Sequence, residues 1–364
     1  MFLDIDKNMT KQTPLVSICV PSLNTFPFLR ERIDTILGQT YTNWEMIVID
    51  SFSDDGSWEL FQKLAQEDKR VSISQAPRGL YRCWNECVQR AQGRYVYIAT
   101  SDDTMALDCL EKMVAALEEH TECDLAHCSL RLIDAKGDPS TEQTWPDITV
   151  FAHGAATLVN KRHVRRAPYD GLLHLTGSMV YLSISQLLIR RSLFARIGGF
   201  DTRWGPMGDR NWEMKAGLVA NTVHVPDTWA AWREYPTNAS AAMTCHSSEY
   251  CRNIEEMIED AVVKCESFLA PEVVPGLKDH WLRWSGEMRS YYSRLAIPQS
   301  VFRKRLFQAS QVFNGQKSVR SEVMGRLCGK RRWTDRAPDE LRNWLESFGL
   351  GPVLADVSDH SRIE

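Results

Sequence analysis

The sequence predicts an α/β fold: a mostly parallel sheet with helices on both faces, followed by a helical C-terminal region. The first 120 residues alternate short β-type runs with amphipathic segments. The run Met46–Ile49 is continuously apolar, as expected of a strand that is covered on both sides. Repeated β-α-β units imply right-handed crossovers and a parallel sheet. After about Thr244, apolar residues recur at helical spacing.

Each expected element follows from a local pattern. The alternation of Val16, Ile18 and Val20 indicates the first strand, and the apolar recurrence from Leu29 to Leu37 indicates the first helix. Further strands are expected at 46–49, 71–73, 95–99, 125–132 and 187–189, and further helices near 60–64, 84–91, 108–119, 192–197, 209–218, 254–268 and 337–348. We therefore expect an α/β domain at 14–245, a helical region at 246–352, and flexible termini at 1–13 and 353–364.

Composition indicates a globular, cytosolic protein. The 364 residues contain no run of 18 apolar residues, and the start lacks the basic-then-apolar order of a signal peptide. The ten cysteines include no Cys-x-x-Cys pair, so we expect reduced thiols and no zinc site. The net charge of -4 is unevenly distributed along the chain: the basic segment at 300–336 contains ten Lys and Arg residues and two acidic residues.

An acidic pair, Asp102 and Asp103, follows the strand expected at 95–99. Adjacent carboxylates repel each other and lose hydration if the site closes. A divalent cation would remove both costs, because Mg²⁺ and Mn²⁺ accept one or two protein carboxylates together with phosphate oxygens. Two interpretations therefore stay open: a metal–diphosphate site, or a solvated acidic turn before the helix at 108–119.

Three polar loops follow expected strands, at 21–24, 50–57 and 100–103. In parallel sheets, ligands bind beyond the carboxyl ends of the strands. The sequence has no Gly-x-Gly-x-x-Gly after the first strand and no Gly-Lys-Ser/Thr, which excludes the dinucleotide and Walker cradles. The three loops together predict a composite nucleotide pocket.

Several motifs occur in the order and at the spacing of one enzyme family. They are Val16–Asn24, an opening strand with a turn like Pro-Thr-Tyr-Asn; Gln39–Glu45, like Gln-Thr-Tyr-x-Asn-x-Glu; the loop Asp50–Ser57; Arg78–Leu80 with Asn85; Ser101–Asp103, like an Asp-x-Asp metal motif; and Arg190–Asp201 followed by Gly208-Asp209. Through these motifs residues 14–245 resemble the family 2 glycosyltransferases, which have the Rossmann-like GT-A fold.

The resemblance implies an inverting transfer of a sugar from a nucleotide-diphosphate sugar to a hydroxyl acceptor, a saccharide or lipid-linked saccharide such as a growing surface glycan. It makes 14–245 the catalytic domain and Asp209 the general base. It assigns Asp103 as the chief ligand of Mg²⁺ or Mn²⁺ and places Asp102 near the ribose or the metal. Trp212 and Glu213 are candidate acceptor contacts. The nucleotide-binding residues that it implies are Pro21, Ser22, Asn24, Asp50, Arg78 and Asp102.

The chain also departs from the family pattern. Ser51 and Phe52 replace an Asp-Gly pair, which puts uridine specificity in doubt, and Gly208 replaces a frequent Glu. Tyr235 stands where many relatives have a metal-binding His. A catalytically inactive nucleotide-sugar-binding scaffold or regulator is therefore the alternative function. A nucleotidyltransferase is less favoured, because 21–24 is not the Gly-rich, basic loop that such an enzyme needs.

Plainer roles remain open for the candidate residues. Asp209 could cap a helix, Asp50 could be a turn residue, and Arg78 could be a solvated charge. Trp212 could be a core residue and Glu213 a solvated helix position. The cluster His163, Arg165, Arg166 and His174 could orient an anionic acceptor or form an ordinary polar surface.

The basic segment 300–336 has three interpretations. It could be a solvated helical surface, a face that docks on the acidic remainder of the chain or on another subunit, or a contact to the inner, anionic face of a membrane. Nucleic-acid binding is disfavoured, because the domain is not basic overall and lacks a recognition motif. We expect a cytoplasmic protein, with peripheral membrane contact through 300–336 as one option.

Overall fold

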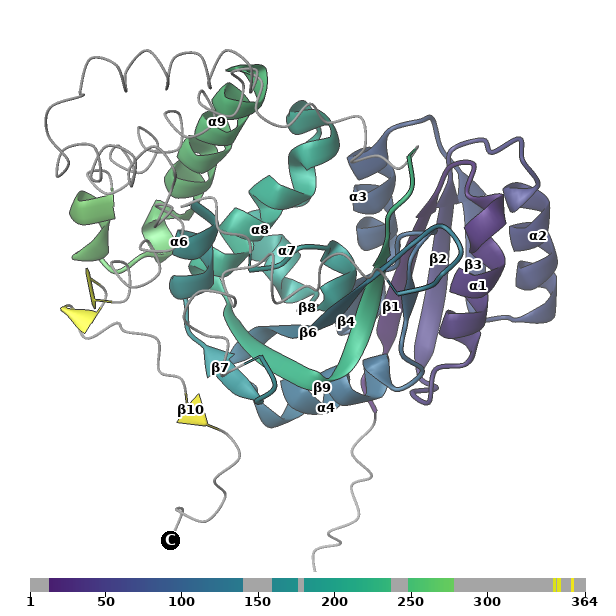
Figure 1. The fold of residues 1–364 in the computed structure, drawn as a ribbon, viewed down its shortest axis with the longest axis horizontal. Helices are drawn as coiled ribbons and strands as arrows, with labels where there is room; N and C mark the ends of the chain where they lie inside the picture. Colours follow the sequence, from purple (N-terminus) through teal and green to yellow (C-terminus); the bar gives the residue numbers. More distant parts are fainter. Residues whose placement is uncertain are drawn as a thin grey trace, which may run out of the picture.

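The structure, a computed structural model, describes residues 13–139, 159–175, 180–236 and 248–277, with short pieces at 343–344, 346–347 and 355–356. Its centre is a single sheet in the order β10-β7-β9-β6-β8-β4-β1-β2-β3, with β5 attached to β9 (Figure 1). The predicted α/β fold is confirmed, and the expected strands lie within a few residues of observed ones. The sequence did not predict the strands at 104–105, 163–165 and 221–233 or the helix at 169–175. The helix expected at 337–348 lies mostly outside the described residues.

One half of the sheet is parallel. It contains β1 (Val16–Ser22), β2 (Trp44–Asp50), β3 (Val71–Gln75) and β4 (Tyr95–Ile98). β1 pairs in parallel with both β2 and β4, and β2 pairs in parallel with β3. The carboxyl ends of these four strands therefore meet at one edge, as the sequence predicts.

The other half is mixed. β8 (Leu187–Arg190) lies antiparallel between β4 and β6 (Cys123–Ile133), whereas β6 and the long β9 (Asn221–Arg233) are parallel. The short strands β5 (Thr104–Met105) and β7 (His163–Arg165) pair antiparallel with β9. This half departs from strict β-α-β alternation because β9 bends across the sheet and pairs with three strands.

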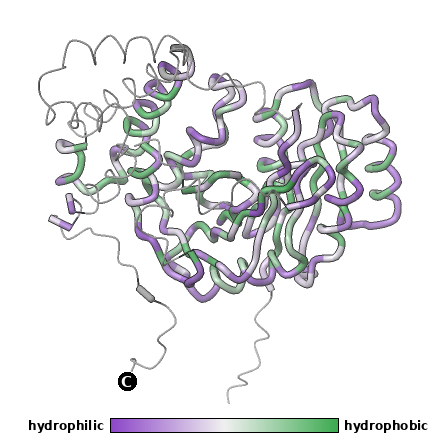
Figure 2. Tube along the Cα trace, in the orientation of Figure 1, coloured by the Kyte–Doolittle hydropathy of each residue, from purple (hydrophilic) through white to green (hydrophobic). Residues whose placement is uncertain are grey.

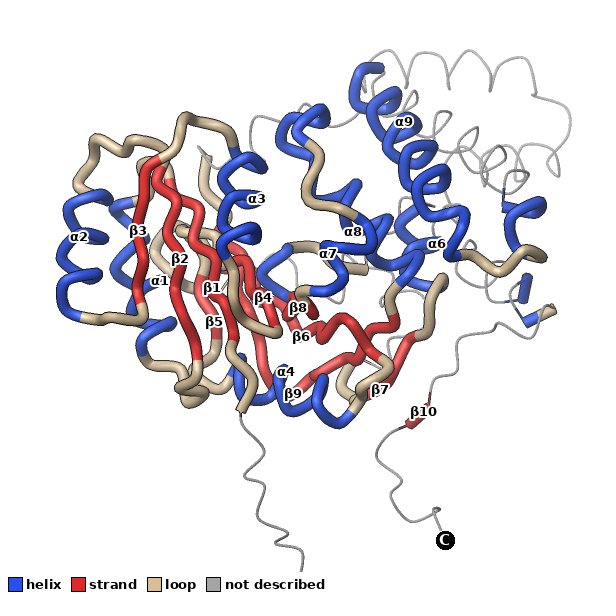
Figure 3. Tube along the Cα trace, turned by 180° about the vertical axis from the view of Figure 1, so that it is seen from behind, coloured by secondary structure: helices blue, strands red, loops and turns tan. Residues whose placement is uncertain are grey.

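Helices cover both faces of the sheet. They are α1 (Phe26–Leu37), α2 (Ser57–Glu67), α3 (Leu80–Arg90), α4 (Cys109–Glu119), α6 (Tyr169–Leu175), α7 (Ser192–Ile197), α8 (Gly208–Val219) and α9 (Ser248–Cys265). The views from opposite sides place α1 on one face and α3 on the other (Figures 1 and 3). Short 3-10 turns lie at Ile184–Gln186 (η3), Thr202–Met207 (η4) and Glu266–Phe268 (η5).

The apolar pattern explains the core. Every residue of β1 and β4 is buried, and the hydrophobic colours run along the central strands (Figure 2). The α9 residues Ile254, Met257 and Ile258 belong to the same buried cluster, so this helix packs on the α/β domain. Phe268, which we expected to continue the inward face, is 48% exposed because α9 ends at Cys265 and the chain turns.

The ends of the chain differ in part from expectation. Ala355 and Asp356 form β10, which pairs antiparallel with β7, so this piece of the predicted flexible C-terminus is a strand. Hydrogen bonding to an open edge of the sheet is the physical reason. The basic segment 300–336 lies outside the described residues. Among the helices that are described, none combines the length and the hydrophobicity needed to span a bilayer.

Candidate active site

The first two loops of the carboxyl edge are hydrogen-bonded to each other. The backbone N–H of Asn24 donates to Ser53 Oγ at 2.9 Å, and Asn24 Oδ1 accepts from the N–H of Asp54 at 3.0 Å. At the start of α1, the N–H of Phe26 donates to Asp55 Oδ2 at 2.8 Å. The loops predicted to share a nucleotide pocket are therefore one connected structure.

Asp50 holds its own loop in place. Its carboxylate is fully buried and accepts from the N–H and the hydroxyl of Ser53 and from Gln75 Nε2. Direct contact with a nucleotide would require this side chain to leave these partners. In the structure, Asp50 lies beneath the surface of the site, whereas we expected it to contact the nucleotide at that surface.

Asn24 and Phe52 adopt left-handed backbone conformations, with φ of 52° and 58°. For a bulky residue such as Phe this conformation is costly, and such strain persists where surrounding contacts fix it and concentrates at functional sites. The Phe52 ring is nevertheless 59% exposed. The loop after β2 therefore presents an exposed aromatic side chain at the edge of the sheet that carries the polar loops.

The remaining predicted nucleotide contacts differ in access. Pro21 and Ser22 are buried, whereas Asn24 and Arg78 are exposed. Thr25 bridges the first loop to the acidic loop, because its hydroxyl donates to Ser101 Oγ at 2.9 Å. Asn24 and Arg78 are thus better placed than Pro21 and Ser22 to contact a ligand.

The acidic pair consists of one buried and one accessible carboxylate. Asp103 is 2% exposed; its Oδ1 accepts from the backbone N–H of Arg233 at 2.8 Å, and its Oδ2 accepts from Ser185 Oγ at 3.0 Å and from the Thr100 hydroxyl. Burial, and then the neighbouring Asp102 charge, raises the pKa of Asp103 to about 7. Asp103, expected to be the chief metal ligand, is therefore the buried and hydrogen-bonded member of the pair.

Asp102 is the accessible member of the pair. It is half-buried, and its Oδ2 accepts from the hydroxyl of Tyr235 at 2.7 Å. Burial, followed by the Asp102 charge, raises the pKa of the Tyr235 hydroxyl, which keeps it a neutral donor. Tyr235, at the position of the expected histidine, thus touches the acidic pair through a hydrogen bond.

Arg233, at the end of β9, is a site residue that the sequence did not single out. It is 1% exposed, and its guanidinium donates to the backbone oxygen of Asp102 at 2.7 Å and to Glu31 Oε2 at 2.6 Å. Arg233 thus holds the acidic loop through backbone contacts, while the charge of the buried Arg32 partly opposes the rise in the pKa of Asp103. In the sequence, Arg233 could have been noticed as a basic residue that ends an apolar run, two residues before Tyr235.

Asp209 lies in the first turn of α8. Its Oδ1 accepts from the hydroxyl of Tyr81 at 2.9 Å and from the N–H of Arg210 at 2.8 Å. Burial raises the pKa of Asp209, and these two donors partly oppose the rise. Tyr81 lies in the first turn of α3, which starts beyond the carboxyl end of β3, so Asp209 is held at the same edge as the polar loops.

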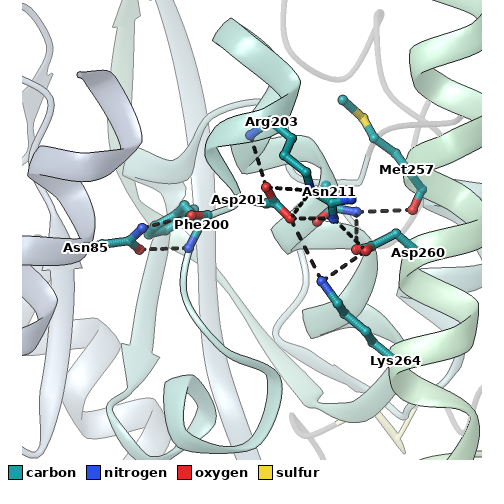
Figure 4. Close-up of polar contacts among 8 residues, drawn as sticks. All are labelled: Asn85, Phe200, Asp201, Arg203, Asn211, Met257, Asp260 and Lys264. Carbon is teal, nitrogen blue, oxygen red and sulfur yellow. Dashed lines mark hydrogen bonds and ion pairs between the residues drawn. The ribbon is translucent and has the colours of Figure 1, made fainter.

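The loop before Asp209 is anchored on both sides (Figure 4). From α3, the Asn85 side chain donates to the Phe200 carbonyl and accepts from the Phe200 N–H, both at 2.8 Å. From α9, Asp260 accepts from Arg203 at 2.8 Å, and Lys264 Nζ lies 3.8 Å from Asp201 Oδ2. The position of the candidate base is therefore set by two helices that are distant in sequence.

Trp212 and Glu213 of α8, which we expected to contact the acceptor, are both buried. Trp212 is fully buried against Phe194 and Phe200, and its Nε1 donates to the Gly198 carbonyl, so it is a core residue. Glu213 is 2% exposed and is not a solvated position. Burial, and then the Asp209 charge, raises its pKa well above the usual range. An acceptor surface formed by these two side chains is not present.

Three members of the basic and histidine cluster, His163, Arg165 and His174, are interior, whereas Arg166 is exposed. Arg165 donates to Asp170 Oδ1 at 2.7 Å with both side chains buried, and His163 and His174 are buried beside them. Neither an acceptor-orienting surface nor an ordinary polar surface describes these three residues. They form part of the packing of β7 and α6.

The carboxylates of the acidic pair could provide only part of the coordination of a divalent cation. Among the described residues, no group of three or more His, Cys, Asp or Glu side chains is arranged to hold a metal. Mg²⁺ and Mn²⁺ nevertheless need only one or two carboxylates when a diphosphate supplies further oxygens. Asp102 fits this requirement, because it is accessible and only its Oδ2 receives the Tyr235 hydrogen bond.

Comparison with known proteins identifies the family. The sequence profile of glycosyl transferase family 2 matches residues 17–198, half of the chain. This chain belongs to glycosyl transferase family 2. The family and the fold class expected from the sequence are confirmed. The matched range ends before Asp209, so the match does not test the predicted role of Asp209 as general base.

Relatives cover part of the chain. The teichuronic acid biosynthesis protein TuaG of Bacillus subtilis is 32% identical over 133 residues, 36% of this chain and 52% of TuaG. Glycosyltransferase GlyG of Streptococcus pneumoniae is 33% identical over 107 residues, 29% of this chain and 36% of GlyG. The chain thus spans about half or less of the length of these two relatives.

A solved structure shares the fold. Staphylococcus aureus TarS, residues 1–349 in complex with UDP-GlcNAc, superposes with a TM-score of 0.58 at 16% identity, over 78% of this chain and 76% of that TarS fragment. At this identity the likeness concerns the fold, and it extends past the range that the family profile matches.

Proposed function

We propose that this family member transfers a sugar, with inversion, from a nucleotide-diphosphate sugar to a hydroxyl acceptor. The observation that carries the proposal is the shared edge: the acidic pair follows β4, and Asp209 is hydrogen-bonded to the first turn of α3 beyond β3. The complex of TarS with UDP-GlcNAc supports a nucleotide sugar as donor.

The donor would lie across the connected loops of β1 and β2. Asn24 and Arg78 are exposed there and would contact its polar groups, and the exposed Phe52 ring would offer an apolar face to the base. We assign Asp102, in place of Asp103, to hold Mg²⁺ or Mn²⁺. A divalent ion bound there would neutralise the charge that develops on the leaving diphosphate.

Asp209 would act on the acceptor. A hydroxyl is a poor nucleophile until a carboxylate within hydrogen-bond reach begins to remove its proton, which contributes roughly 10²–10⁴ in rate. Burial raises the pKa of Asp209, which makes the carboxylate a stronger base than an exposed aspartate. A single base, with the leaving group on the opposite side of the anomeric carbon, gives one displacement and therefore inversion.

The acceptor is proposed to be a saccharide or lipid-linked saccharide of a surface polymer. The name of TuaG, which refers to teichuronic acid biosynthesis, supports this class. Peripheral membrane contact through 300–336 belongs to the same proposal. Sedimentation with neutral and anionic vesicles tests it: equal binding to both would contradict an electrostatic contact.

The test measures nucleoside diphosphate released from a panel of nucleotide sugars with Mn²⁺. We expect release by the wild-type chain, loss of about 10²-fold or more in Asp209→Asn with donor binding kept, and weaker Mn²⁺-dependent binding in Asp102→Asn. Asp68→Asn, which removes a surface charge paired with Arg70, is the matched control and should retain turnover. Full turnover in Asp209→Asn would show that another group is the base.

A catalytically inactive nucleotide-sugar-binding scaffold is the second candidate. The observation that favours it is that residues of the chain already donate hydrogen bonds to the acidic pair. Tyr235 donates to Asp102, and Arg233 donates to both Asp102 and Asp103. The same assay separates the two functions. Binding of a nucleotide sugar with no release of nucleoside diphosphate, for any acceptor supplied, would favour the scaffold.

A further inference from the structure

Helix α3 contacts the loop of the candidate base at two places. Tyr81 and Asn85 are four residues apart, so they lie on the same face of the helix. Asn85 binds the backbone of Phe200, at the start of the loop. Tyr81 reaches the end of the loop, where its hydroxyl lies 2.9 Å from both the Pro206 carbonyl oxygen and Asp209 Oδ1.

The two contacts of Tyr81 compete for one proton. A phenol has a single O–H, while the Pro206 carbonyl and an ionised Asp209 are both acceptors. With Asp209 ionised, the charge-assisted bond to the carboxylate is the stronger choice. Once Asp209 has taken a proton, the carboxyl can donate to the phenol oxygen and the phenol can donate to Pro206. Both protonation states of Asp209 therefore keep a partner.

Gly208 makes room for this arrangement. A Cβ at position 208 would lie 2.6 Å from Tyr81 Cδ2 and 2.4 Å from the backbone oxygen of Asp201, closer than atoms can approach. The Tyr81 ring thus occupies the space beside the residue that precedes the base. The glycine that departs from the family pattern and the buried tyrosine of α3 fit one another.

The other charged groups near Asp209 are Arg210 and Glu213 of α8. The N–H of Arg210 donates to the same oxygen, and the Arg210 guanidinium donates to the Tyr250 hydroxyl of α9 at 2.7 Å. The Arg210 charge is also near enough to oppose the rise in the pKa of Asp209 that burial causes. Glu213, one turn along α8, is a buried carboxyl whose charge would oppose that of Asp209. Tyr81 is the side-chain donor that α3 supplies to Asp209.

We propose that Tyr81 is a positioning residue for the reaction, which fixes the carboxylate of Asp209 and exchanges its hydrogen bond between Asp209 and Pro206 as the base gains and loses the acceptor's proton. The inference rests on the proposed role of Asp209 as general base. It adds a residue of α3, outside the polar loops, to the machinery of the site.

The test compares Tyr81→Phe with the wild type by the pH dependence of kcat/KM. The variant keeps the ring and loses the hydroxyl, so Asp209 loses a donor that stabilises its charged form and the acidic limb should move to higher pH, by about one unit. At neutral pH kcat should fall roughly 10- to 150-fold, the rate equivalent of a hydrogen bond to a charged group. The KM for the donor should stay within about threefold.

Two control variants separate positioning from structure. Tyr41→Phe removes a hydroxyl that donates to the Pro14 carbonyl, near the opposite end of β1, and should leave the profile unchanged. Asn85→Ala releases the other anchor of the loop without touching Asp209, so it should lower kcat while the acidic limb stays at the wild-type pH.

The outcomes distinguish this inference from the proposed function. A wild-type chain that releases no nucleoside diphosphate overturns the proposed function and the role of Tyr81 with it. A wild-type chain that turns over, while Tyr81→Phe keeps its acidic limb and its kcat, overturns the role of Tyr81 alone. If Tyr81→Phe melts at a lower temperature and lowers kcat with an unmoved acidic limb, the tyrosine is structural and the proposal is wrong.

Discussion

Two substitutions of Asp103 test how the acidic pair is supported. In Asp103→Asn the amide oxygen can still accept from the Arg233 N–H, and the hydroxyls of Thr100 and Ser185 can turn to accept from the amide nitrogen. We expect a cost of about 1 kcal/mol or less. In Asp103→Leu the buried N–H loses its acceptor, which costs about 1–3 kcal/mol, with a further loss at the hydroxyls. We expect about 2–4 kcal/mol in total.

The pH dependence sharpens this prediction. The pKa of Asp103 is raised from 3.8 to about 7, so between these pH values the folded protein binds more protons than the unfolded chain. The free energy of unfolding should therefore fall as pH rises from about 4 to about 7. At about 1.4 kcal/mol per pH unit, the contribution of this group is at most about 4 kcal/mol. Asp103→Asn cannot titrate, so it should lose this slope.

Urea unfolding in metal-free buffer at pH 5 and pH 8 provides the assay. The wild type should lose more stability between the two pH values than Asp103→Asn does, and Asp103→Leu should be the least stable variant at pH 5. Asp68→Asn, with its exposed partner Arg70, should retain the wild-type slope. Equal slopes for the wild type and Asp103→Asn would refute the reasoning about this buried carboxyl.

Three further substitutions have defined outcomes. Gly199→Ala would place a Cβ 2.3 Å from Asn85 Oδ1, so it should break the anchor at Phe200 and lower kcat, measured by nucleoside diphosphate release. Trp212→Ala empties a fully buried site and should cost about 3–5 kcal/mol in urea unfolding. Phe52→Gly removes left-handed strain at φ 58°, and should raise the free energy of unfolding by up to about 1 kcal/mol while weakening nucleotide binding in calorimetry.

Local patterns were sufficient for the parallel half of the sheet and for the edge that carries the site, but not for β9, the long strand that ends at Arg233. The alternation in β1, the apolar run of β2 and the helical spacing of α9 each indicate which residues of that element are buried. Burial of this kind follows from the periodicity of neighbouring residues, so it can be predicted from the sequence. The polar loops could be placed together because parallel strands end at one edge. Asp209 could be located through the motif resemblance, and the structure then supplied its partner Tyr81.

Burial of individual polar side chains could not be predicted in this way. Asp102 and Asp103 are neighbours, and the assignment of the buried and the accessible member depends on β9 delivering the Arg233 N–H from 130 positions along the chain. The same holds for Trp212 and Glu213, whose surroundings come from other segments of the fold. Contacts between distant segments leave no periodic signal in the local sequence.

The most direct test of the central claim, that the acidic pair and Asp209 flank one donor site, is an anomalous diffraction map. Crystals would be grown with Mn²⁺ and a nucleoside diphosphate. The account predicts a manganese peak beside the carboxylate of Asp102, with the diphosphate lying between that carboxylate and the first turn of α3. A manganese peak remote from Asp102, or a diphosphate bound away from the edge that Tyr81 and Asp209 share, would contradict it.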